Sequence, residues 1–131
     1  MPKNTLSWKK KPEAADFAAA FNYLSLVYPD AQARTLVSGL RKAGTTGRAA
    51  KDLLRATGLP LLPRDEAHVE TDLRRIHKGK PLSPVLLVQG DLSRHVLLVI
   101  ADGYHRICAV CYFDEDAPIA CRMTPAPAPP R

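Results

Sequence analysis

The sequence predicts an α+β protein in which helices pack against a small mixed β-sheet. Apolar residues recur at helical spacing through the first half of the chain. Short uninterrupted apolar runs, which are typical of buried strands, occupy 84–88 and 96–101 in the second half. The whole chain has 131 residues, which suits one compact domain or a small domain with an extension.

Three helices are expected in the N-terminal part. The first follows Pro12 and stops before Pro29, and its apolar residues Phe17, Phe21 and Leu24 fall on one face. The second helix has Asp30 as its expected N-cap and ends before Gly44. The third opens at one of two threonines and also ends at a glycine. The predicted bounds are 13–28, 30–42 and 45 or 46 to 57.

After residue 58 the sequence predicts short strands and two helices. Residues 59–63 hold two prolines, which confine them to an edge strand or a connector. Asp65 is expected to start a helix that ends at Gly79. A turn-rich loop at 89–95 separates the two apolar strands. A helix over 103 to 113 or 114 and a last strand over 117–123 complete the order.

Charge and composition suggest three regions. Residues 1–57 hold 10 of the 19 Lys and Arg but only 4 of the 13 Asp and Glu, so the net charge of +6 lies there. We therefore expect a basic helical region over 1–57, the sheet-bearing domain over 58–123 and a proline-rich tail over 124–131.

Several protein classes are disfavoured by composition. No apolar run approaches the roughly 20 residues that a membrane span needs, and no apolar segment follows Met1–Thr5 as in a secretory signal. The 3 cysteines are an odd number, which favours free thiols in a reducing compartment. The expected location is the cytoplasm. Cys108 and Cys111 lie three residues apart, and we interpret them as small core residues rather than metal ligands.

A basic segment offers one route to a function. Two predicted helices flank the 44–47 turn, and basic side chains surround it, so residues 34–55 resemble a helix-turn-helix that grips nucleic acid. The alternative is an ordinary solvated surface. The basic residues near the turn are Arg41, Lys42, Arg48, Lys51 and Arg55.

The turn Asp102–Arg106 offers a second route. It follows a predicted buried strand and opens a helix, where free backbone N–H groups and the helix dipole favour an anion. His105 and Arg106 add two basic side chains in the first helical turn. Asp102 is expected to cap this helix, with the alternative that its carboxylate holds Mg²⁺ or acts as a base.

This turn, with the strands before it and the strand after its helix, resembles the ParB/sulfiredoxin-like superfamily over about residues 59–123. ParB-type domains often carry a D-G-x-H-R element here, and sulfiredoxins carry G-G-C-H-R. The resemblance implies that Gly103, Tyr104, His105 and Arg106 form a nucleotide phosphate site, with secondary contacts from the residues that match a sulfiredoxin Lys-Val-x-Ser pattern. Those secondary residues are His68 and Thr71.

The resemblance also limits the chemistry. Tyr104 replaces the reactive cysteine of sulfiredoxins, so sulfinic acid reduction is not expected. The functional prediction is a nucleotide- or phosphate-binding protein, with phosphotransfer or nucleotide hydrolysis as the reactions considered. Asp102 and His105 are the candidate catalytic residues, and ATP or CTP with Mg²⁺ are the candidate ligands. The alternative is a DNA-binding or regulatory adaptor without catalysis. A homodimer is left open by the sequence.

Overall fold

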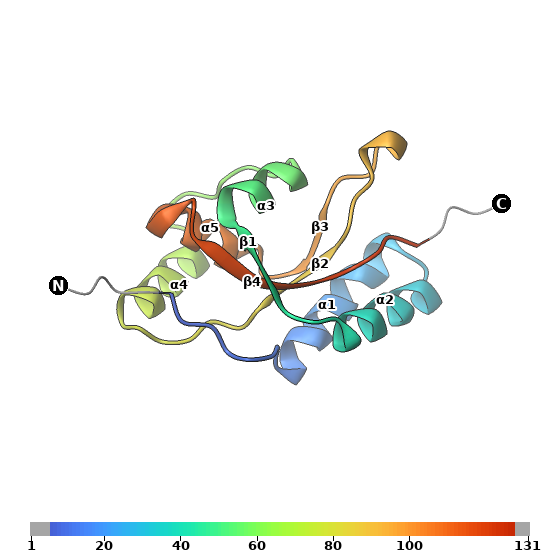
Figure 1. The fold of residues 1–131 in the computed structure, drawn as a ribbon, viewed down its shortest axis with the longest axis horizontal. Coiled ribbons are helices and arrows are strands. Elements are labelled where there is room, and N and C mark those ends of the chain that lie inside the picture. The colour runs from blue at the N-terminus through green and yellow to red at the C-terminus, as the bar shows by residue number, and fades with distance from the viewer. Residues whose placement is uncertain (1–5, 128–131) are drawn as a thin grey trace.

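The computed structural model describes residues 6–127 (Figure 1). Residues 1–5 and 128–131, which include the leader prediction and half of the predicted tail, lie outside the described residues. The helices are α1 (Ala14–Val27), α2 (Asp30–Lys42), α3 (Ala50–Thr57), α4 (Ala67–His77), the short 3₁₀ helix η1 (Leu92–Arg94) and α5 (Tyr104–Asp114). The strands are β1 (Thr46–Ala49), β2 (Val85–Val88), β3 (Val99–Asp102) and β4 (Pro118–Thr124).

The four strands form one mixed sheet in the order β1-β4-β2-β3. β4 runs parallel to β2 and antiparallel to β1, and β3 runs antiparallel to β2. The α+β class and the mixed sheet are therefore as the sequence predicts. Because β1 lies within residues 1–57 and its partner β4 lies after residue 58, the sheet spans both predicted regions.

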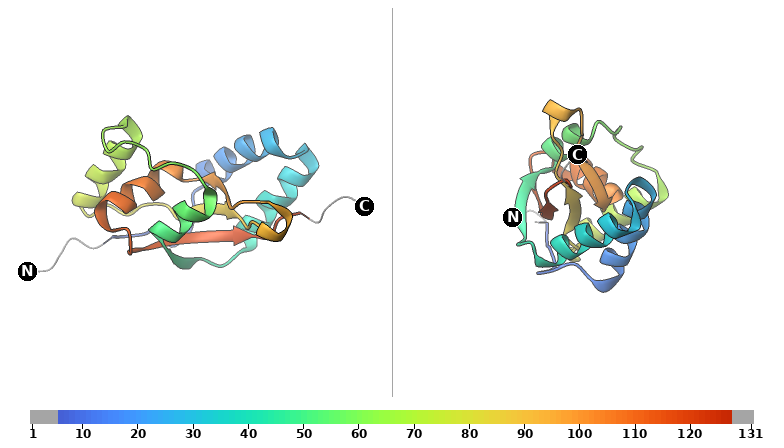
Figure 2. Two further views of the ribbon diagram at one scale, coloured as in Figure 1. Left: turned by 90° about the horizontal axis from the view of Figure 1, so that it is seen from above. Right: turned by 90° about the vertical axis from the view of Figure 1, so that its right-hand side faces the viewer.

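Helices cover both faces of this sheet (Figures 1 and 2). α3, α4 and α5 contribute to one apolar cluster, whereas α1 and α2 contribute to the other. The side chains of β2 alternate between them, with Val85 and Leu87 in the first cluster and Leu86 and Val88 in the second. A strand covered on both faces needs apolar residues at every position, which explains the run Val85–Val88.

The predicted helix faces are confirmed for α1 and α2. Phe17 and Leu24 of α1 are buried, and α2 buries its stripe of Leu36, Val37 and Leu40. Glu13 precedes α1 and forms a reciprocal capping box with Asp16. Asp30 is the first helical residue of α2, which places the cap at Pro29 instead.

The helix predicted from Thr45 or Thr46 is wrong in its first part. Thr46–Ala49 form β1, in which Thr46 pairs with Cys121 and Ala49 with Pro118. α3 starts only at Ala50 and is eight residues long. The strand arises from pairing with a segment about 70 residues away, which local helical periodicity does not register. A strand consequently separates α2 from α3, so the predicted helix-turn-helix is absent.

The strand predicted over 96–101 is also shifted. β3 runs from Val99 to Asp102, while Val96 forms only an isolated bridge with Asp91, and Leu97 is half exposed. The predicted helix from Asp65 instead begins after Glu66. Residues 59–63 form a connector without strand pairing, which was one of the two predicted alternatives.

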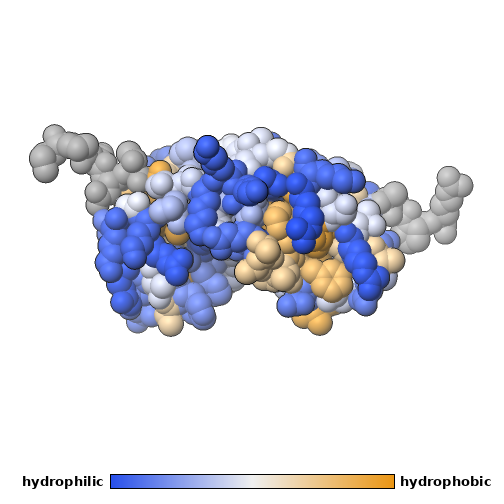
Figure 3. Space-filling model, turned by 90° about the horizontal axis from the view of Figure 1, so that it is seen from below, coloured by the Kyte–Doolittle hydropathy of each residue, from blue (hydrophilic) through white to orange (hydrophobic). Residues whose placement is uncertain are grey.

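Two further features concern the surface and the N-terminal segment. Trp8 forms a β-bridge with Leu82 and packs on the first cluster, so it anchors the N-terminal segment. α1 also exposes apolar side chains, with Leu26 82% exposed. Figure 3 views the molecule from below and shows an apolar patch among hydrophilic side chains in its right half. Within residues 6–127 no helix combines the length and apolarity needed to cross a membrane.

Candidate functional site

The turn between β3 and α5 depends on a glycine. Gly103 has φ +113°, a conformation that side chains disfavour, and a Cβ placed there would lie 2.5 Å from Val85 Cγ1. Gly103 is also the N-cap of α5, and no side chain caps this helix among the described residues. Asp102 is therefore the last residue of β3 and not the predicted cap. The open first turn of α5 retains N–H groups that an anion can bind.

Arg106 is committed to contacts inside the protein. Its guanidinium donates to the Ser83 carbonyl at 2.6 Å and to Asp102 Oδ2 at 2.6 Å. A second carboxylate, Asp16 Oδ1 of α1, lies 3.8 Å from the same side chain. Only 13% of the Arg106 side chain is exposed. These contacts join α5 to the chain before β2 and to α1, so Arg106 stabilises the turn from the inside.

The carboxyl groups beside Arg106 are in an unusual environment. Burial raises the pKa of Asp102 above its ordinary value, and Asp16 raises it further, although Arg106 opposes both effects. Burial likewise raises the pKa of Asp72 on α4, against the opposing influence of Arg106. Perturbed carboxyl groups are common at functional sites, but structural ion pairs produce them too. The contacts of Asp102 are those of a partner that holds Arg106.

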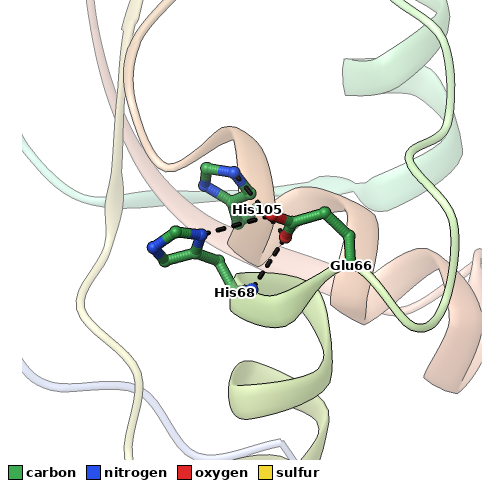
Figure 4. Close-up of side chains that lie close together, drawn as sticks. All are labelled: Glu66, His68 and His105. Atoms are coloured by element: carbon green, nitrogen blue, oxygen red, sulfur yellow. Dashed lines mark hydrogen bonds and ion pairs between the residues drawn. The ribbon is translucent and has the colours of Figure 1, made fainter.

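His105 points to a different set of neighbours, shown in Figure 4. Its Nε2 lies 3.8 Å from Glu66 Oε1, and His68 Nδ1 lies 3.3 Å from Glu66 Oε2. The two imidazole rings are 4.7 Å apart between centroids. His105 and His68 come from the first turns of α5 and α4, so packing of these two helices brings the predicted primary and secondary site residues together. The two side chains are 42% and 74% exposed.

Glu66 is the site residue that the sequence prediction missed. Its Oε1 accepts hydrogen bonds from the N–H groups of His68 and Val69, which caps α4. The bond from Val69 is the largest of the influences that lower its carboxyl pKa. Its position two residues before His68, at the start of an amphipathic helix, was the sequence signal that could have identified it. Asp65, a more common type of cap residue, was predicted at the helix start instead.

The hydroxyl groups of the two remaining predicted residues are bonded within the protein. Tyr104 donates its hydroxyl to the Pro60 carbonyl at 2.5 Å, and Tyr112, about two helical turns later, donates to the Leu62 carbonyl. Both tyrosines thus tie the 59–63 connector to α5. Thr71 donates its hydroxyl to the Ala67 carbonyl of its own helix at 2.9 Å. Neither hydroxyl is directed at the histidine pair by these bonds.

A cavity of about 720 Å³ adjoins the turn. Its lining includes the turn residues 102–105, Thr57 and Leu59 at the end of α3, and Tyr23 of α1. This volume is within the range of roughly 300–1,000 Å³ that small-molecule sites occupy. His105 therefore borders both the cavity and the cluster with Glu66 and His68.

Several basic side chains of residues 34–55 have partners on the protein itself. Arg41 lies over the Phe17 ring at 4.5 Å, Lys51 pairs with Asp116 at 2.5 Å and Arg55 lies 3.6 Å from Asp52. The two ion pairs neutralise part of the positive charge of this segment. Binding of nucleic acid through this segment stays a prediction, now without the helix-turn-helix that suggested it.

The cysteines resemble core residues more than reactive thiols. Cys108 and Cys121 are buried, and burial raises the pKa of both thiols. Burial also raises the pKa of Cys111 to about 11. Thiolates, the form that attacks or binds metal, are thereby disfavoured.

Comparisons of the chain with protein-family models, with curated proteins and with solved structures found no match.

Proposed function

We propose that this protein binds the phosphate group of a nucleotide or another phosphorylated small molecule at the first turn of α5, as the ParB/sulfiredoxin-like resemblance implies. The observation that carries the proposal is the open, uncapped start of α5 on the wall of a cavity of about 720 Å³. Backbone N–H groups at such a start, aided by the helix dipole, are suited to phosphate oxygens.

The side chains divide the work in this proposal. His105 and Tyr104 line the cavity, and the His68 ring lies beside His105 at 4.7 Å between centroids, so the two exposed histidines are the proposed phosphate contacts. Arg106 contributes indirectly, because its bonds to Asp102 and Ser83 hold the turn in shape. ATP or CTP with Mg²⁺ remain the ligands to test first. Phosphotransfer and nucleotide hydrolysis are the reactions that such a site would serve.

Calorimetry with ATP, CTP, ADP and GTP, each with and without Mg²⁺, tests the proposal on the full chain. We expect saturable binding of at least one nucleotide, weakened in a His105→Gln variant. His77→Gln is the matched control, because His77 lies in the last turn of α4. Absence of binding by every nucleotide, or equal binding by wild type and His105→Gln, contradicts the proposal.

A further inference from the structure

Glu66, His68 and His105 form a cluster whose chemistry goes beyond a phosphate site. Each offers one ligand atom, and these three atoms all lie within 4.8 Å of one another. Two imidazoles and a carboxylate are a donor set that Zn²⁺ uses in catalytic sites, together with a fourth, open position. We propose that these three residues bind a divalent transition-metal ion of the zinc type at the junction of α4 and α5.

The spacing fits the size of such an ion. A tetrahedral Zn²⁺ with bonds of about 2.0–2.1 Å separates its ligand atoms by about 3.3–3.4 Å. His68 Nδ1 is 3.3 Å from Glu66 Oε2, and His105 Nε2 is 3.8 Å from Glu66 Oε1. These two distances involve different oxygens of Glu66, and the three ligand atoms all lie within 4.8 Å of one another, so rotation of the exposed imidazoles has to supply the remaining approach.

The ligands are also held and aimed by the fold. Glu66 is fixed because its Oε1 accepts two backbone N–H bonds from the start of α4, which leaves Oε2 directed at His68. His105 is fixed by the first turn of α5, which Gly103 and Arg106 position. Hydrogen bonds from backbone donors to a ligating carboxylate are the kind of supporting contact that orients metal ligands.

Charge decides what the fourth position accepts. One carboxylate and two neutral imidazoles leave a bound divalent ion with one net positive charge, and the start of α5 adds its dipole. The open position therefore favours an anionic oxygen or a polarised water. His105 also borders the cavity beside Gly103, so a ligand in the cavity can reach the ion. The metal site does not depend on the proposed phosphate binding.

The test is calorimetric titration of metal-free full-length protein with Zn²⁺, in the absence of nucleotide and phosphate. We expect one Zn²⁺ per chain and no comparable binding of Mg²⁺, since imidazole ligands favour zinc over magnesium. Glu66→Gln, His68→Gln and His105→Gln should each weaken binding by at least ~10-fold, the effect seen even for groups that only orient a ligand. His77→Gln and Cys111→Ser should bind as wild type does.

Several results overturn the proposal. These are no saturable Zn²⁺ binding, equal affinity in wild type and His68→Gln, loss of binding in Cys111→Ser, or Mg²⁺ binding as tight as Zn²⁺. His68→Gln keeps the test decisive if the capping variant Glu66→Gln fails to fold, because the His68 side chain is 74% exposed. Repeating the Mg²⁺-free nucleotide titrations on metal-free protein separates failure of the metal site from failure of the phosphate site.

Discussion

Two neighbouring residues of one turn, His105 and Arg106, belong to opposite environments. The Arg106 side chain is 13% exposed and is held by Asp102 and backbone carbonyls. The His105 side chain is 42% exposed, with Glu66 and His68 as partners at longer distances. A pair of basic residues at a helix start is therefore not automatically a pair of ligand contacts. One residue stabilises the turn and the other is available to a ligand.

The largest loss of stability is expected for Arg106, the residue of the pair that has the structural role. Arg106→Ala removes the cation that compensates Asp102 and Asp16, so these largely buried carboxylates lose their shared partner, while Asp16 keeps its bond from the Glu13 N–H. We expect a loss of about 3–5 kcal/mol in the free energy of unfolding, the usual scale for breaking such a pair from one side. Urea denaturation measures it. A loss below about 1 kcal/mol would place Arg106 with the exposed groups.

The glycine of the turn is the next test. Gly103→Ala combines a positive φ with a Cβ 2.5 Å from Val85 Cγ1. We expect a loss of about 3 kcal/mol, at the upper end of the cost of local backbone strain. Gly79→Ala is the matched control, since φ is +70° there with no atom within 4 Å of the added Cβ, and it should cost about 1 kcal/mol. Equal thermal shifts in the two variants would show that close packing at Val85 is unimportant.

The pH dependence of stability distinguishes the environment of Asp102 from that of Glu66. The folded-state pKa of Asp102 is raised, mainly by burial, so the folded protein binds this proton more readily than the unfolded chain. Stability from this group therefore grows as the pH falls through the raised pKa and shrinks as the pH rises.

We accordingly expect the stability of wild type relative to Asp102→Asn to decrease from about pH 4 to pH 7, as followed by urea midpoints. Glu66 should behave oppositely, because its pKa is lowered, chiefly by the Val69 bond. Its contribution is present above the ordinary glutamate range and is lost as the pH falls through the lowered pKa. Identical pH trends for Asp102→Asn and Glu66→Gln would contradict the division into two environments.

The smallest effect is expected at the exposed histidines. His105→Ala breaks a contact of 3.8 Å between partly exposed groups, so the free energy of unfolding should change by no more than about 0.5 kcal/mol. Thermal unfolding followed by circular dichroism checks this. The same variant is expected to lose ligand binding, which makes it the reverse of Arg106→Ala. A destabilisation as large as that of Arg106→Ala would make His105 a structural residue.

Features that depend on near neighbours along the chain could be predicted from the sequence alone. The apolar spacing of Leu36, Val37 and Leu40 predicted the buried face of α2, and the run Val85–Val88 predicted a strand covered on both sides. Proline and glycine gave most helix ends to within a residue or two. The start of α5, whose N-cap is Gly103, was also predictable, because a glycine follows an apolar strand and precedes a helical pattern.

Only the tertiary structure decided which distant groups meet. β1 exists because Thr46–Ala49 pair with β4, and nothing in its four residues marks them as a strand without that partner. Likewise, the choice of Asp102 and Ser83 as partners for Arg106, and of Glu66 and His68 for His105, follows from how α4, α5 and β2 pack. Local periodicity reports which face of an element is apolar, whereas long-range packing sets the element it faces. The turn Asp102–Arg106 was therefore visible in the sequence, and the division of its side chains between stability and binding was not.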